Sequence, residues 1–211
     1  MKTIAVIDYD MGNLHSACKG FEQAGATTLV TDSPQDIAEA DAVVLPGVGA
    51  FDPAMQHIRS RHLEQPIKDA IASGKPFLGI CLGLQILFEA SEEGTEKGLG
   101  VIPGTVKKFH PEPGITIPHM GWNQLELTQA NHPLWQQLPD NPYVYFVHSY
   151  YVEPQDTSVN AATVTHGSQK VTAAIAYNNL IAVQFHPEKS SDHGLQILSN
   201  FVTLVNSTIA V

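Results

Sequence analysis

The cysteine at position 81 lies between two glycines, in the segment Gly79-Ile80-Cys81-Leu82-Gly83. An apolar run before it predicts a buried strand over residues 77–80, and apolar residues at i, i+3 and i+4 after it predict the start of an amphipathic helix, at Leu84, Leu87 and Phe88. A strand that turns sharply into a helix through Gly-x-nucleophile-x-Gly is the elbow geometry of many hydrolases. A helix N-terminus favours the thiolate form of a cysteine. We therefore predict that Cys81 is a nucleophile rather than an ordinary core cysteine.

A histidine and a glutamate two residues apart follow a second apolar run, in Phe185-His186-Pro187-Glu188. Side chains two apart on an extended segment point the same way, and a proline keeps the residue before it extended. A carboxylate bonded to Nδ1–H would hold the imidazole while Nε2 takes a proton from a thiol. His-Pro-Glu alone would fit a surface turn. Together with the cysteine, it predicts a Cys81–His186–Glu188 triad in an order unlike that of papain-type proteases.

A third segment, Pro46-Gly47-Val48-Gly49, follows the predicted strand at residues 42–45. Loops at the carboxyl ends of neighbouring parallel strands meet over one crevice. The glycines free the backbone around Gly47 and Val48 to aim N–H groups at an oxyanion, where the N–H of Leu82 would join them. A plain turn or a phosphate loop is the alternative. Nucleotide binding is poorly supported, because the chain lacks Gly-Lys-Ser/Thr and Gly-x-Gly-x-x-Gly at this loop.

Alternating strands and helices position these segments. The periodicity predicts strands at residues 4–7, 28–31, 42–45 and 77–80, and helices at 14–24, 34–40, twice within 52–73, and at 191–205. Further strands are expected at 101–109 and 124–127, and a hairpin at 173–176 and 181–184. The expected fold class is α/β: a mostly parallel central sheet flanked by helices, with a smaller antiparallel addition. Residues 1–211 are interpreted as one domain.

The composition fits a globular enzyme: 43% of the residues are hydrophobic and 15% are charged. A net charge of −10 argues against non-specific binding to nucleic acid or anionic membranes. The N-terminal apolar run is too short for a signal peptide, and no run approaches the roughly 18 residues of a membrane span. Two cysteines are too few for a disulfide framework, which favours a reducing cytoplasm.

The remaining cysteine and the histidines give no second site. Cys18 lies among apolar residues of a predicted helix and is expected to be a buried structural thiol. The ten histidines include no metal-binding spacing, so no metal is predicted. Most of them are expected at the surface, on the basis of the polar surroundings of His57, His62, His110 and His132.

Taken together, the cysteine segment with Gln85 and the Phe-His-Pro-Glu segment resemble the triad-type (class I) glutamine amidotransferases, which have a flavodoxin-like core. Further segments are similar to the glutaminase subunits of imidazole glycerol phosphate synthase within that family: Gly12-Asn13-Leu14, Pro46-Gly47-Val48-Gly49-x-Phe51, Pro118-His119-Met120-Gly121-Trp122-Asn123 and Tyr145-Phe146-Val147-His148-Ser149-Tyr150. The resemblance covers essentially the whole chain. One departure is Leu84, where the family commonly has methionine, a swap that nearly conserves volume.

The resemblance implies that glutamine is hydrolysed through a cysteinyl thioester, without a cofactor, and that the ammonia passes to a (β/α)8-barrel cyclase subunit in histidine biosynthesis. It implies that Cys81 is the nucleophile, His186 the general base and then acid, and Glu188 its orienter. By the same resemblance, the substrate would be held by Gly49, Gln85, Glu93, Ser149 and Tyr150. The partner would contact Asn13, Trp122, Tyr145 and Lys189. For Trp122, a place in the core is the alternative.

Three other functions stay open on the sequence. The chain is similar enough to other glutaminases, such as the one that serves pyridoxal phosphate synthase, for that partner to be considered. A catalytically inactive binding module would keep the fold but need not keep the triad. A cysteine peptidase of similar fold is the third, and Gln85 and the C-terminal His-Pro-Glu argue against it.

Overall fold

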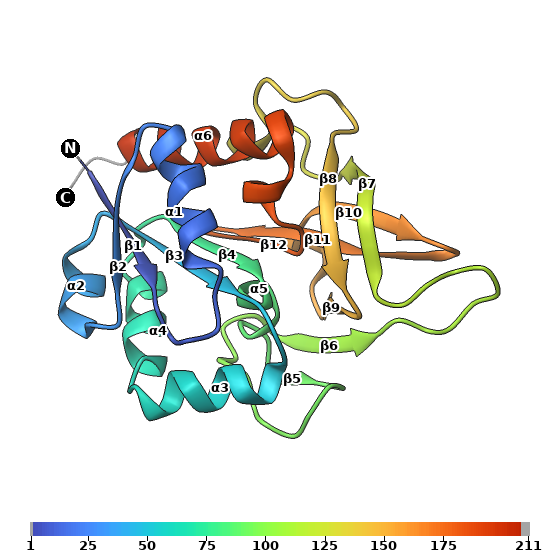
Figure 1. The fold of residues 1–211 in the computed structure, drawn as a ribbon, viewed down its shortest axis with the longest axis horizontal. Helices are drawn as coiled ribbons and strands as arrows, with labels where there is room; N and C mark the ends of the chain where they lie inside the picture. The colour runs from blue at the N-terminus through green and yellow to red at the C-terminus, as the bar shows by residue number, and fades with distance from the viewer. Residues whose placement is uncertain (1, 208–211) are drawn as a thin grey trace.

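The computed structural model describes residues 2–207, and its centre is one mixed sheet in which neighbouring strands run β2-β1-β3-β4-β12-β11-β10-β7-β8 (Figure 1). The first five strands of this order pair in parallel. They are β2 (Thr27–Thr31), β1 (Thr3–Ile7), β3 (Ala42–Gly47), β4 (Phe77–Cys81) and β12 (Leu180–Val183). The last strand of the chain therefore lies in the middle of the sheet.

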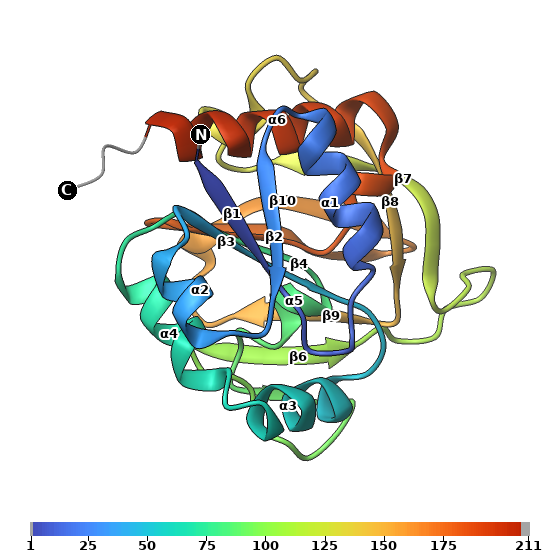
Figure 2. The same ribbon diagram turned by 60° about the vertical axis from the view of Figure 1, so that its left-hand side comes forward.

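Helices cover both faces of the parallel strands. Figures 1 and 2 show α1 and α6 on one side and α2, α3 and α4 on the other. Their bounds are α1 (Leu14–Gln23), α2 (Pro34–Glu39), α3 (Phe51–Ser60), α4 (Glu64–Ala72) and α6 (Ser191–Ser207). Strand β1 explains this arrangement, because its side chains alternate between two apolar cores: Ile4 and Val6 pack on the α1/α6 side, and Ala5 and Ile7 on the other. The helices on the first side meet through an edge-to-face ring contact.

The antiparallel part extends the sheet beyond β12. It comprises β11 (Gln169–Tyr177), β10 (Asn160–His166), β7 (His119–Leu127) and β8 (Tyr143–His148), with β9 (Tyr150–Pro154), β6 (Gly104–Lys108) and the short β5 (Ala90–Ser91) paired off this path. Three 3₁₀ turns lie at Pro133–Trp135 (η1), Thr157–Val159 (η2) and Pro187–Lys189 (η3). The parallel sheet, its two helical layers, the β11–β12 hairpin and the antiparallel addition are confirmed. Strands β5, β8, β9 and β10 were not predicted from the sequence.

One expected helix is largely absent. Helix α5 covers only Leu82–Gln85 and is followed by turns, so the predicted amphipathic helix through Leu87 and Phe88 is wrong. The reason is burial on all sides: Leu84, Leu87 and Phe88 are fully buried, and the apolar spacing reflected a core segment rather than one face of a helix.

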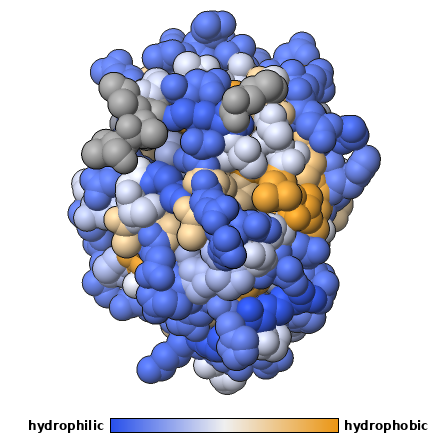
Figure 3. Space-filling view, turned by 90° about the vertical axis from the view of Figure 1, so that its left-hand side faces the viewer, coloured by the Kyte–Doolittle hydropathy of each residue, from blue (hydrophilic) through white to orange (hydrophobic). Residues whose placement is uncertain are grey.

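Strand β2 forms one edge of the sheet, on the side of the molecule turned toward the viewer in Figure 3. That side is mostly hydrophilic with a hydrophobic patch, and β2 itself exposes Leu29 and Val30. Among residues 2–207, none of the helices is long and apolar enough to cross a lipid bilayer.

Candidate active site

Cys81 occupies a strained turn at the end of β4. Its backbone has φ 55° and ψ −109°, a conformation that favours glycine over any residue with a Cβ. The next turn is equally tight, because a Cβ on Gly83 would lie 1.9 Å from the carbonyl oxygen of Leu45. This geometry confirms the sharp strand-to-helix turn. The four-residue helix behind it is too short for the dipole effect expected from the sequence.

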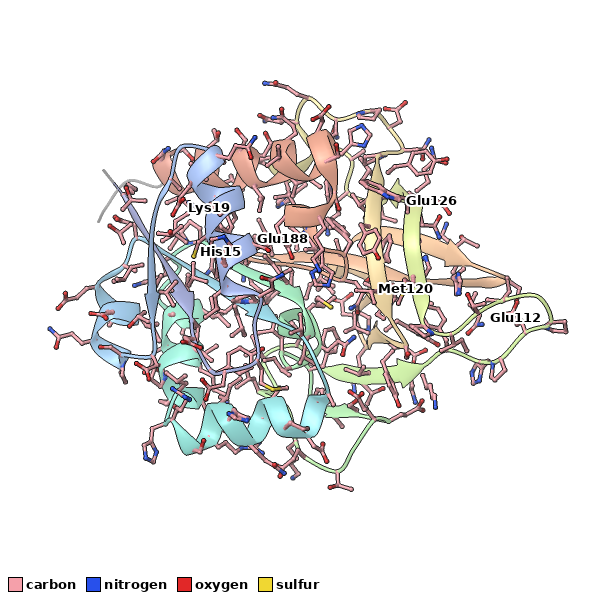
Figure 4. All side chains as sticks on the ribbon, viewed as in Figure 1. His15, Lys19, Glu112, Met120, Glu126 and Glu188 are labelled. Carbon is pink, nitrogen blue, oxygen red and sulfur yellow. The ribbon has the colours of Figure 1, made fainter. Side chains whose placement is uncertain are left out.

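The imidazole of His186 and the carboxylate of Glu188 form a direct hydrogen bond. Nδ1 of His186 lies 2.9 Å from Oε1 of Glu188, and both side chains are almost completely buried. Figure 4 shows Glu188 in the interior beside α1. The pairing arises differently from the expectation: β12 ends at Val183, and the η3 turn rather than a continuous strand brings the two side chains together.

The electrostatics of this group favour a charged imidazole. Burial alone would lower the pKa of His186, but its interactions with the nearby Cys81 thiol and with the Glu188 carboxylate outweigh burial and raise the pKa to about 10. Nε2 of His186 is buried and makes no hydrogen bond, and the residue lines the same cavity as the Cys81 thiol. The arrangement can therefore move a proton between sulfur and the ring while the carboxylate stabilises the imidazolium.

The backbone of His186 is tied to strand β8. Its N–H donates to the carbonyl of Tyr145 at 3.0 Å, and its own carbonyl accepts a hydrogen bond from the Ser190 hydroxyl at 2.6 Å. The same hydroxyl accepts from the N–H of Tyr145 at 2.9 Å. The ring is thus positioned by two elements, η3 and β8.

A cavity of about 320 Å³ opens at the thiol. It is lined by Cys81, His186 and Leu82, by Val48 and all five expected substrate-binding residues (Gly49, Gln85, Glu93, Ser149 and Tyr150), and by Pro118, Val147 and His148. Gly47 and Glu188 do not line it. The last three lining residues were missed by sequence reasoning. His148 had a usable signal, because it lies within the same Tyr-Phe-Val-His-Ser-Tyr segment as two expected residues.

Two cavity side chains are already engaged. Nε2 of Gln85 donates to the carbonyl of Tyr150 and to Oε1 of Gln184, each at 3.1 Å, and Gln184 in turn lies 3.8 Å from the Cys81 sulfur. Glu93 accepts a hydrogen bond from the N–H of Phe51 at 2.9 Å, at the start of α3. Gln184, fully buried, was not foreseen as part of this group.

The Gly47–Val48 peptide points away from the cavity. The N–H of Val48 donates to the carbonyl of Met11 at 2.7 Å. Because the N–H and C=O of a trans peptide point in opposite directions, the carbonyl of Gly47 points away from Met11. In this arrangement the peptide offers no donor to an oxyanion, and the N-terminal loop, which the sequence analysis gave no task, is what holds it.

The four expected partner-contact residues lie at or near the surface. Trp122 is 53% exposed, so the alternative that it belongs to the core is wrong. It is paired with Tyr145 across β7 and β8, and the two rings meet edge to face. Lys189 is exposed on η3, whereas Asn13 caps α1 by accepting from the N–H of Ser16.

Cys18 is buried, as expected, and burial raises the pKa of its thiol. The four histidines named in the sequence analysis are exposed or half-buried. Three others are not at the surface, because His119, His148 and His186 are buried. Among residues 2–207, no three His, Cys, Asp or Glu side chains are grouped to hold a metal ion.

Comparison with known proteins assigns the fold and the class. The family model described as "Glutamine amidotransferase class-I" matches residues 5–205. Two solved structures share the fold at 19% identity: PurLQS from Thermotoga maritima, with a TM-score of 0.74 over 96% of this chain and 98% of that one, and a putative GMP synthase protein from Thermoplasma acidophilum, with 0.72 over 98% and 95%. The chain belongs to the class-I glutamine amidotransferase family.

Within that family, the similarity to one group extends over the full length. A protein of Gloeothece citriformis is 76% identical over 205 residues, 97% of this chain and 97% of its own length. A protein of Cyanothece sp. is 74% identical over 211 residues, 100% of each. Both carry the name "Imidazole glycerol phosphate synthase subunit HisH".

Proposed function

We propose that residues 1–211 form a single glutaminase domain, which hydrolyses L-glutamine to L-glutamate and ammonia and supplies the ammonia to imidazole glycerol phosphate synthesis. The observation that carries the proposal is the grouping of the Cys81 thiol, the His186 imidazole and the Glu188 carboxylate at the edge of a cavity large enough for one amino acid. The names of the full-length relatives favour this synthase over the one that makes pyridoxal phosphate.

The chemistry follows from the geometry. The Cys81 thiolate attacks the side-chain amide carbon of glutamine, and His186 gives its proton to the departing ammonia. A thioester remains. His186 then takes a proton from water, and the hydroxide releases glutamate and restores the thiol.

In this proposal the oxyanion is bound by the N–H of Leu82, which is the first of α5 and has no acceptor within its helix. A second donor requires the Gly47–Val48 peptide to turn over, which breaks the hydrogen bond to Met11. Because the loss of one oxyanion donor costs about 2.7–4 kcal/mol, the isolated chain should be slow by about 10²–10³. We infer that binding of a partner turns the Gly47–Val48 peptide over, so that its N–H becomes the second oxyanion donor.

The partner in this proposal is a (β/α)8-barrel cyclase that uses a phosphoribulosyl substrate and receives ammonia directly. Support comes from the name "subunit" carried by the relatives and from the exposed Trp122–Tyr145 pair, since large amphipathic side chains anchor protein interfaces. Tyr145 also binds the backbone of His186, so this surface is joined to the site. A cytoplasmic location is proposed from the two unpaired cysteines.

Glutamate release tests the proposal. We expect slow turnover by the chain alone, strong activation by the cyclase and its ligand, and none in Cys81→Ala, which should still assemble. Glutamate release retained by Cys81→Ala would refute the triad. Turnover indifferent to the cyclase would refute the coupling and leave the glutaminase in place.

A further inference from the structure

Two buried histidines that the proposed chemistry does not use lie side by side at the cavity, and one of them, His148, lines it. His119 is 4% exposed and His148 is 5% exposed. Nδ1 of His119 is 2.9 Å from Nε2 of His148, and Nδ1 of His148 is 2.8 Å from the carbonyl oxygen of Tyr150. The rings come from β7 and β8, which pair directly at these two positions.

The partners determine which nitrogen carries each proton. A carbonyl oxygen only accepts, so Nδ1 of His148 must donate to Tyr150, and Nε2 of the neutral ring must then accept. That acceptor requires a donor at Nδ1 of His119, which leaves its Nε2 to accept from Nδ2 of Asn123 at 3.0 Å. The same Nδ2 donates to the carbonyl of Thr165 at 2.9 Å, which fixes the orientation of this amide. Every hydrogen bond in this row, which runs from Asn123 through His119 and His148 to the Tyr150 carbonyl, thus has one possible direction.

Both rings are neutral in this row, as the directions require. Burial, followed by the charge of His166, lowers the pKa of His119 to about 4. Burial dominates at His148 as well and lowers its pKa to about 3, against the opposing hydrogen bond to Tyr150. His166 stacks on His119 at 4.2 Å between ring centroids but bonds only to the carbonyl of Thr116, outside the row.

The row continues into the cavity. The carbonyl of Tyr150 also accepts from Nε2 of Gln85, and the second hydrogen on that nitrogen goes to Gln184. With both hydrogens of Nε2 engaged, Oε1 is the polar atom that Gln85 has left for a ligand in the cavity it lines. An amide oxygen suits an ammonium group and offers nothing to a carboxylate.

We infer that His119 and His148 are positioning residues: their hydrogen bonds hold the Tyr150 carbonyl in place, that carbonyl orients the Gln85 amide with its oxygen toward the cavity, and this oxygen receives the α-ammonium group of the amino-acid substrate. This inference rests on the proposed glutaminase function. The two histidines touch neither the thiol nor the scissile amide, so they act on substrate binding and not on the chemical step.

Substitutions at His148 separate this role from simple packing. Asn places an N–H close to the position of Nδ1, whereas Phe keeps the ring volume and removes both polar atoms. In the Cys81→Ala background, we expect His148→Phe to weaken glutamine binding by about tenfold, the equivalent of about 1.4 kcal/mol, as measured by calorimetry. His148→Asn should bind within about threefold of the parent. His166→Phe is the matched control, since it keeps a stacked ring outside the row, and should leave binding unchanged.

With Cys81 restored and the cyclase present, the same variants should separate KM from kcat. His148→Phe should raise KM about tenfold and keep kcat within about threefold. Equal losses in His148→Phe and His148→Asn, or a loss confined to kcat, would overturn the inference.

Ring nitrogen spectra of the full chain give a readout that needs no glutamine. Both His119 and His148 should carry their proton on Nδ1, the less common form of a free neutral imidazole. Protons on Nε2 would overturn the inference whatever the enzyme does. If Cys81→Ala binds no glutamine at all, the proposed function fails, and the spectra still report whether the row exists.

Discussion

Replacing the cysteine by glycine should make the protein inactive and more stable than the corresponding alanine variant. The backbone of Cys81, at φ 55° and ψ −109°, lies in a region that costs a residue with a Cβ about 1–3 kcal/mol. Alanine removes the sulfur and keeps this strain. Glycine removes both, at a cost of about 0.5–1 kcal/mol for its greater freedom in the unfolded chain.

Taking about 2 kcal/mol for the strain, the net difference is about 1 kcal/mol in favour of Cys81→Gly. For a chain of this size, that corresponds to an unfolding temperature about 2–4 °C above that of Cys81→Ala. Urea unfolding and calorimetry measure it, and both variants should release no glutamate. Ala38→Gly on the exposed face of α2 is the control with the opposite sign, since glycine lowers helix stability by about 0.5–1 kcal/mol. If Cys81→Gly is no more stable than Cys81→Ala, the turn is not strained.

Three further outcomes follow from the site and its surroundings. Glu188→Gln should lower glutaminase kcat by about 10²–10⁴, because the imidazolium loses its charged partner; a loss under tenfold would contradict that role. Trp122→Ala should change the free energy of unfolding by less than about 0.5 kcal/mol yet weaken cyclase binding by about 2 kcal/mol or more in titrations, whereas the equally exposed Tyr177→Ala should do neither. Between pH 6.5 and 5, the free energy of unfolding should decrease as the pH is lowered, by up to about 1.4 kcal/mol per pH unit for each ring. Unfolded histidines bind protons in this range, whereas folded His119 and His148 stay neutral down to about pH 4 and 3. A flat profile would show that the rings are not shielded.

The candidate catalytic residues were easier to pick out in the sequence than the local structure that holds them. The cysteine segment and His-Pro-Glu were informative because glycine and proline restrict the backbone directly, at the elbow and at η3. The segment after the elbow misled the prediction, since full burial of Leu84 and Leu87 imitates the spacing of a helix face. Periodicity reports burial, and burial on every side leaves no face to detect.

Contacts between segments far apart in the sequence could not be predicted, because no local sequence pattern reports them. The hydrogen bond from Val48 to Met11 joins two loops, and its direction depends on which way one peptide plane is turned. The alignment of His119 with His148 depends on the register of β7 against β8, and β8 was not predicted from the sequence. Gln184 reaches the sulfur only because β12 lies beside β4.

The central position of β12 has a consequence for synthesis on the ribosome. A growing chain that ends before Leu180 already contains the elbow, but it has neither the imidazole nor the strand that joins the parallel and antiparallel halves of the sheet. Insertion of a late strand between β4 and β11 closes very long loops, a slow step in folding. A nascent or truncated chain therefore carries a thiol without its base, and the capacity to consume glutamine arises only when the sheet is complete.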